Sequence, residues 1–253
     1  MLTMKILVLI LSVIACGVLV LLLKIKSGRA TKLLLSFSGA YILALCLFHL
    51  IPEVYSQISN ASIAGWSIVT GFLLQLVLDY ISGGIEHGHI HLDKDKHHHH
   101  HDHDRHHDHP VIEKFPVMMM VGLCIHAFIE GFPLFFSHVS DALFVGIIFH
   151  NIPISITLTT VFLMAGRTAL KSFGALFIFS LMTPAGALAA KLFFPEQHSF
   201  YDLAGPIALG IVIGIFLHIS TTILFESDKN HRFNLAKLLT VLVGVLIAFF
   251  LNQ

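Results

Sequence analysis

Three side chains in the second half of the chain have the types and spacing of a metal site. The stretch "HAFIEG" places His126 and Glu130 four residues apart, which on a helix puts both on the same face. The next apolar stretch contains "HNIPIS", which adds His150 and Asn151. Two imidazoles and one carboxylate make three ligands for a metal such as zinc and leave a fourth position for water. His126, Glu130, His150 and Asn151 are therefore the candidate metal-binding residues.

These residues lie near the middle of apolar stretches that are long enough to cross a membrane. A charged side chain in the bilayer core costs at least about 2.5 kcal/mol, so ionisable groups there are functional candidates. A single histidine could instead hydrogen-bond to a neighbouring helix, which contributes about 0.6 kcal/mol. The clustering of three such groups favours a metal site. Pro153 adds a kink beside them, because its ring displaces the carbonyl of Phe149.

A second set of metal-binding side chains forms a polar tract between two apolar stretches. Residues 87–109 contain 12 of the chain's 19 histidines, and Asp102, Asp104 and Asp108 interleave with the densest part of the run, residues 97–109. The position in the middle of the chain argues against an expression tag. Such a composition is typical of a metal binder that needs no fold. The tract alone does not distinguish a protein that senses or stores metal from one that moves it.

Other polar positions have two interpretations each. In "HLIPE", His49 and Glu53 are again four residues apart but near the end of their stretch, so they are either an entrance pair or interfacial residues. Asp79 lies near the end of its stretch and either lines an exit or sits among the headgroups. His218 is a candidate to support the metal ligands from a neighbouring helix.

The composition indicates which elements must position these residues. The chain is 56% hydrophobic and only 12% charged, whereas soluble domains carry about 25% charged residues. We therefore predict an all-α, polytopic membrane protein with a single transmembrane domain, residues 1–253. A span needs about 20 apolar residues, and eight stretches qualify: 5–24, 32–54, 63–82, 115–137, 141–164, 171–193, 204–226 and 235–251.

The first of these stretches also resembles a signal peptide, because Lys5 precedes an apolar run. The run continues to Leu23, about 18 residues, which favours a first membrane helix over a cleaved signal.

The basic residues predict the orientation of the spans. Thirteen of the 15 lysines and arginines fall in alternate loops, and only Lys5 and Lys191 fall on the other side. Basic loops stay in the cytoplasm. We therefore expect a multi-pass protein of the inner (plasma) membrane with both termini outside and residues 87–109 as a disordered cytoplasmic loop between the third and fourth helices.

No catalytic motif accompanies the candidate site. The sequence has no HExxH, no nucleophile elbow and no phosphate loop, so we expect neither an enzyme nor a resident cofactor. The expected partners are a divalent metal ion as substrate and membrane lipid, but not nucleic acid. A homodimer is left open.

The pattern resembles the ZIP family of zinc and iron transporters over essentially the whole chain. "HLIPE", "HAFIEG", "HNIPIS" and "SLMTPAGA" are similar to the family's motifs in the second, fourth, fifth and sixth helices. The resemblance implies alternating access around His126, Glu130 and His150, with zinc moving into the cytoplasm. The alternative is a membrane sensor or storage protein that does not transport and works through residues 87–109.

The same resemblance also implies a difference from family members that hold two adjacent metals. Ala127 stands where the fourth-helix motif usually has Asn, Ile154 replaces the carboxylate that would bridge the metals, and Thr183 replaces a sixth-helix Glu. The three remaining ligands correspond to one of the two sites, so the expected site is mononuclear.

Overall fold

The computed structural model describes residues 2–23, 29–82, 111–136, 139–226 and 235–251. Nearly all of them are helical, and no strand occurs in these ranges. The histidine-rich tract, residues 87–109, lies outside the described residues. The elements are α1 (Leu2–Leu23), α2 (Arg29–Leu45), η1 (Cys46–Leu50), α3 (Ile51–Gln57), α4 (Ala61–Ser82), α5 (Val111–Gly131), η2 (Phe132–Phe135), α6 (Asp141–Met164), α7 (Ala169–Phe193), α8 (Tyr201–Glu226) and α9 (Leu235–Leu251).

Seven of the described helices are long and apolar enough to cross a membrane. The second of them, Ala30–Gln57, is continuous through α2, a π-helical turn (η1) and α3. The helix α9 coincides with the eighth predicted span, but its 17 residues are fewer than the about 20 that a span usually needs. The all-α membrane architecture is thus confirmed, whereas the count of eight spans remains a prediction.

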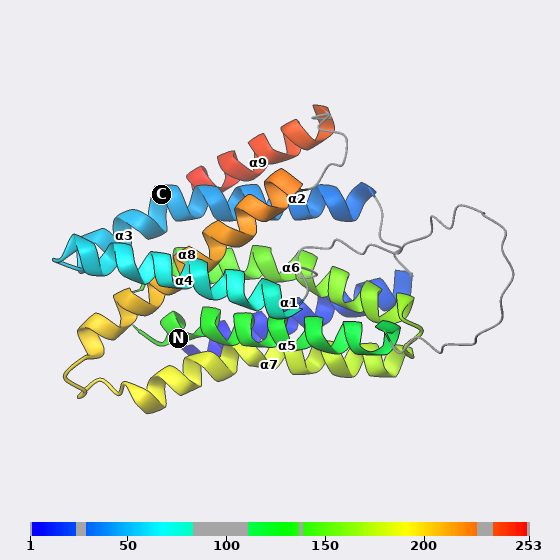
Figure 1. Cartoon of the computed structure of the whole chain (residues 1–253), viewed down its shortest axis with the longest axis horizontal. Helices are drawn as coiled ribbons and strands as arrows, with labels where there is room; N and C mark the ends of the chain where they lie inside the picture. The colour runs from blue at the N-terminus through cyan, green and yellow to red at the C-terminus, as the bar shows by residue number, and fades with distance from the viewer. Residues whose placement is uncertain (1, 24–28, 83–110, 137–138, 227–234, 252–253) are drawn as a thin grey trace, which may run out of the picture.

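The helices pack as two groups (Figure 1). The first, here called the ligand bundle, contains α1, α5, α6 and α7, which pack mainly against one another. The second, the partner bundle, contains α2–η1–α3, α4, α8 and α9; its closest pairs are α4 with α8 and α2 with α9. The two bundles meet where α6 contacts α2 and where α4 contacts α5.

Glycines set the closest helix approach in the partner bundle. A Cβ at Gly71 of α4 would lie 1.9 Å from the carbonyl oxygen of Ile211, and one at Gly214 of α8 would lie 1.9 Å from that of Ile68. No larger residue fits at either position without moving a backbone. Small residues at such crossings are how membrane helices gain van der Waals contact, since burial from lipid gives little driving force.

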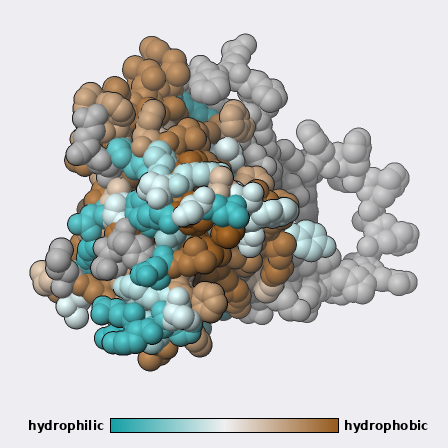
Figure 2. All heavy atoms as spheres, turned by 90° about the vertical axis from the view of Figure 1, so that its left-hand side faces the viewer, coloured by the Kyte–Doolittle hydropathy of each residue, from teal (hydrophilic) through white to brown (hydrophobic). Residues whose placement is uncertain are grey.

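The two ends of the molecule differ in what they carry. One end holds the start of α1, the end of α9 and the connections from α3 to α4 and from α7 to α8 (left in Figure 1). Viewed from that end, hydrophilic residues gather across the face between hydrophobic flanks (Figure 2). We call it the outer end, after the predicted orientation. The opposite, inner end is where α1 ends and α2 and α5 begin.

Candidate metal site

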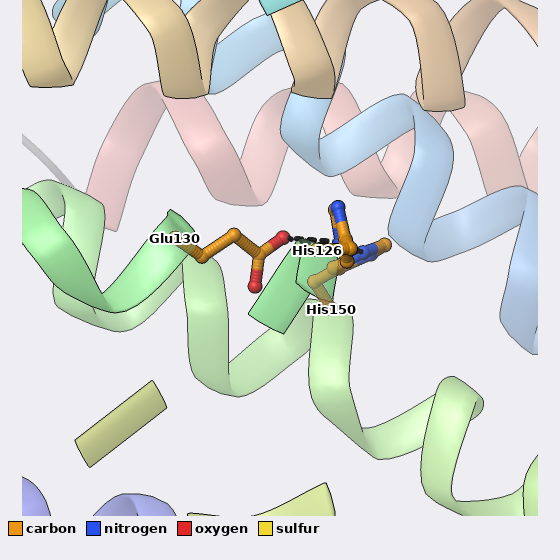
Figure 3. A group of neighbouring side chains, drawn as sticks. All are labelled: His126, Glu130 and His150. Carbon is orange, nitrogen blue, oxygen red and sulfur yellow. Dashed lines mark hydrogen bonds and ion pairs between the residues drawn. The ribbon is translucent and has the colours of Figure 1, made fainter. Parts of the chain in front are cut away.

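Two neighbouring helices of the ligand bundle bring the three predicted ligands together. His126 and Glu130 lie one turn apart near the end of α5, and His150 lies near the middle of α6. Their side chains converge on one point between the helices (Figure 3). The four-residue spacing therefore does what the sequence pattern predicts, since both α5 side chains face α6.

The distances between the three donor atoms suit one small cation. His126 Nε2 lies 2.6 Å from Glu130 Oε1, the two Nε2 atoms lie 3.3 Å apart, and His150 Nε2 lies 3.7 Å from Glu130 Oε1. The point equidistant from these atoms is about 1.9 Å from each, close to the about 2.0–2.2 Å that zinc keeps from nitrogen and oxygen ligands. An ion slightly above the plane of these three donor atoms would be within bonding distance of all of them.

The buried carboxylate of Glu130 lacks a full set of polar partners. The side chains of His126, Glu130 and His150 are at most 2% exposed. Oε1 of Glu130 lies within ion-pair distance of His126 Nε2, with His150 Nε2 further away. Oε2 of Glu130 has no hydrogen-bond partner in the described part of the chain. Burying a carboxylate without a full counter-charge costs several kcal/mol. A bound dication would supply that charge.

The backbone of α7 supports α5 beside the ligands. A Cβ at Gly131 would lie 1.9 Å from the carbonyl oxygen of Thr183, and one at Gly186 would lie 1.9 Å from that of Phe128. The two crossings lie on either side of Glu130 along α5. Close packing here therefore fixes the height and rotation of the turn that carries the carboxylate.

Two of the three positions at which the resemblance expected further ligands are apolar and are buried together. Ala127 and Ile154 are 0% and 6% exposed and belong to one apolar cluster with Leu123, Leu158 and other residues of α1, α5, α6 and α7. Thr183 is also buried, at 3% exposure. The place where a second metal would need donors is thus packed with hydrocarbon.

A narrow pocket extends from the ligands toward the inner end. It has room for about one water molecule. Besides His126 and His150 it is lined by Pro153 and by apolar side chains of both bundles: Leu35, Leu123, Ile154, Ile219 and Ile223. The ligands therefore face the boundary between the bundles.

Asn151, the fourth predicted ligand, is buried next to His150 at 2% exposure. Its Oδ1 has no hydrogen-bond partner in the described ranges, so this oxygen is available as an uncharged ligand to a metal ion. No hydrogen bond in these ranges joins it to the other three residues, and its role as a ligand remains a prediction.

The weaker candidates make contacts that do not include the site. His218 Nδ1 of α8 lies 3.3 Å from Asp79 Oδ2 of α4, and Gln75 Nε2 donates to Asp79 Oδ1 at 3.0 Å. Gln75 was not among the residues expected from the sequence, although its position one turn before Asp79 was a signal for the bond. Glu53 binds the residue that precedes α6.

Fold and site define a polytopic helical membrane protein with a metal-type ligand set in its interior. The family model described as ZIP zinc transporter matches residues 1–252, and the chain belongs to this family. The predicted family is thereby confirmed, and membership supports a membrane transporter of divalent metal ions, which fits the expectation of a protein that is not an enzyme. No curated protein matches the chain.

Proposed function

We propose that this protein carries one zinc ion at a time on His126, Glu130 and His150, and that the ion crosses by alternating access. The observation that supports this most is Glu130, a fully buried carboxylate with two imidazoles as its close neighbours. Two nitrogens and one oxygen are a zinc-type donor set, whereas copper(I) favours sulfur. With three protein ligands, the fourth position stays open for water and for release.

The division into two bundles suggests how access alternates. All three ligands belong to the ligand bundle, and the pocket beside them is closed by Leu35, Ile219 and Ile223 of the partner bundle. A displacement of one bundle against the other would move the ligands past this apolar wall. The ion would then face the inner end without leaving its donors during the movement.

The direction of transport follows from the basic residues. Alternate loops of the sequence carry 13 of the 15 lysines and arginines, and such loops stay in the cytoplasm. Arg167 and Lys171 lie at the inner end defined above, and Lys5 and Lys191 at the outer end. Zinc that leaves through the inner end would enter the cytoplasm.

The decisive experiment is zinc uptake into proteoliposomes by protein that lacks residues 87–109, so that the tract's imidazoles do not mask the site. His126→Ala and Glu130→Ala should each lose uptake and zinc binding. Matched controls are His198→Ala and Glu196→Ala, because both side chains are exposed at the outer end. These controls should transport like the unsubstituted protein.

Two results would contradict the proposal. Unchanged uptake in His126→Ala and Glu130→Ala would exclude this site. Zinc binding without any uptake by the full-length, folded protein would instead favour the sensor or storage alternative.

A further inference from the structure

One carboxylate joins the two bundles at the outer end. Glu53 of α3 accepts a hydrogen bond at Oε1 from the backbone N–H of Ser140, 2.8 Å, and one at Oε2 from the Ser140 hydroxyl, 2.6 Å. Gln57, one turn further along α3, donates to Glu53 Oε1 at 3.4 Å. Ser140 immediately precedes α6, the helix that carries His150.

The bonding of Ser140 is unusual for its position. A serine before a helix usually accepts a hydrogen bond from the helix's first turn. Here the Ser140 side chain caps nothing in α6, and its hydroxyl donates to Glu53 instead. The negative carboxylate also lies at the positive end of the α6 dipole, which is a favourable arrangement. The start of α6 is therefore stabilised by a residue of the other bundle.

Buried apolar side chains separate the outer end from the ligands. His150 lies about 14 Å along α6 from its start, by the rise per residue. Between them, Leu143 and Ile147 are fully buried in a cluster that includes Leu50 and Val54 of the partner bundle. The pocket at the ligands extends to the opposite, inner side.

We infer that Glu53 and Ser140 form an outer latch, and that zinc reaches His126, Glu130 and His150 from outside only after Ser140 leaves Glu53. This inference rests on the transport function proposed above. Glu53 acts as a positioning residue: it touches no ligand, and it holds the start of α6 against α3 while the outer route is closed. The ion pair of Lys5 with Asp141 differs, because both residues belong to the ligand bundle. It ties the start of α6 to α1 and leaves the contact between bundles unaffected.

A cysteine at Ile147 reports whether the outer route is open. Cys16, Cys46 and Cys124 are replaced first, and intact cells are treated with a membrane-impermeant thiol reagent. Glu53→Ala removes both hydrogen bonds from Ser140 and should raise the labelling rate at least about ten-fold, because a single hydrogen bond to a charged group already changes an equilibrium by about that factor. Asp141→Ala, the matched control, also removes a carboxylate at the start of α6 and should leave the rate unchanged. Equal rates in Glu53→Ala and the parent would overturn the latch.

A cross-link tests the same contact in the opposite direction. Glu53→Cys and Ser140→Cys are combined and joined by a bis-methanethiosulfonate, and zinc uptake into proteoliposomes is measured. Uptake should stop on cross-linking and return on reduction, whereas each single variant treated alike should transport. Full uptake by cross-linked protein would also overturn the latch. Labelling does not require uptake, so a parent protein that takes up no zinc would contradict the transport function while the labelling rates still decide the latch.

Discussion

Gly131 of α5 lies directly against the backbone carbonyl of Thr183 in α7, and a Cβ at Gly131 would be 1.9 Å from that oxygen. Gly131 immediately follows Glu130. Any residue larger than glycine must therefore push α5 away from α7 at the turn that holds Glu130, the proposed carboxylate ligand. The contact couples the packing of the ligand bundle to the geometry of its site.

We expect Gly131→Ala to lower the free energy of unfolding by about 1–3 kcal/mol, the usual cost of overpacking, and to weaken zinc binding. Thermal unfolding and zinc titration of the protein without residues 87–109 measure the two effects. Gly174→Ala is the matched control on α7, because a Cβ at that position would meet nothing within 4 Å. Equal melting temperatures and zinc affinities in the two variants would show that the crossing does not constrain the site.

Ile154→Glu should let the site hold a second metal ion. Two dications in a low-dielectric site repel strongly unless a carboxylate bridges them, and Ile154 offers no lone pair. The new carboxylate would be buried in the apolar cluster around Leu158, so the metal-free variant should unfold at lower temperature and zinc should restore it. The measurement is the number of metal ions bound per chain in protein that lacks residues 87–109. Ile154→Gln serves as the uncharged control, and two metals per chain in the parent would disprove the mononuclear site.

Deletion of residues 87–109 should leave the fold intact and change zinc uptake only modestly. The segment has few apolar residues to bury, so it adds little to packing. In the full-length protein its imidazoles should bind zinc near neutral pH and release it as the pH falls through about 6.5, because only neutral imidazole binds the metal. Zinc titrations at several pH values check this. A folded deletion protein without any uptake would place the tract in the transport route.

The orientation can be tested with single cysteines in a Cys-free background. We expect a cysteine at position 102 to be protected from an impermeant reagent outside sealed cells, because basic loops stay in the cytoplasm. A cysteine at Asn60, between α3 and α4, should be labelled. The reverse pattern would invert the orientation and the inferred direction of transport.

The sequence was sufficient for the parts of this protein that depend on local spacing. His126 and Glu130 are one turn apart, and the apolar run lengths predicted the helices close to their observed bounds, because both follow from helix geometry alone. Contacts between segments far apart in the chain could not be predicted from the sequence. Whether His49 and Glu53 were entrance ligands or interfacial residues stayed undecided, because the partner of Glu53 is Ser140, 87 residues away. The π-helical turn at Cys46–Leu50 is too short to produce a repeating hydrophobic pattern, so the sequence did not predict it.

The contact between Asp79 and His218 could not be predicted for the same reason. Each residue alone was compatible with an exit or a supporting role, and only the packing of α4 on α8 shows that they bind each other. The second-metal position was different: Ile154 pointed to a missing ligand, but its burial with Ala127 in one cluster depends on the three-dimensional arrangement of four helices.

The placement of all three ligands on α5 and α6 has a kinetic consequence. Both helices belong to the same bundle. Under the proposed movement of one bundle against the other, the ion would therefore keep its coordination sphere, and ligand exchange would be confined to loading and release. Metals that exchange ligands slowly would then be delayed at those two steps only, and the movement itself would proceed at a rate independent of the cargo's coordination chemistry.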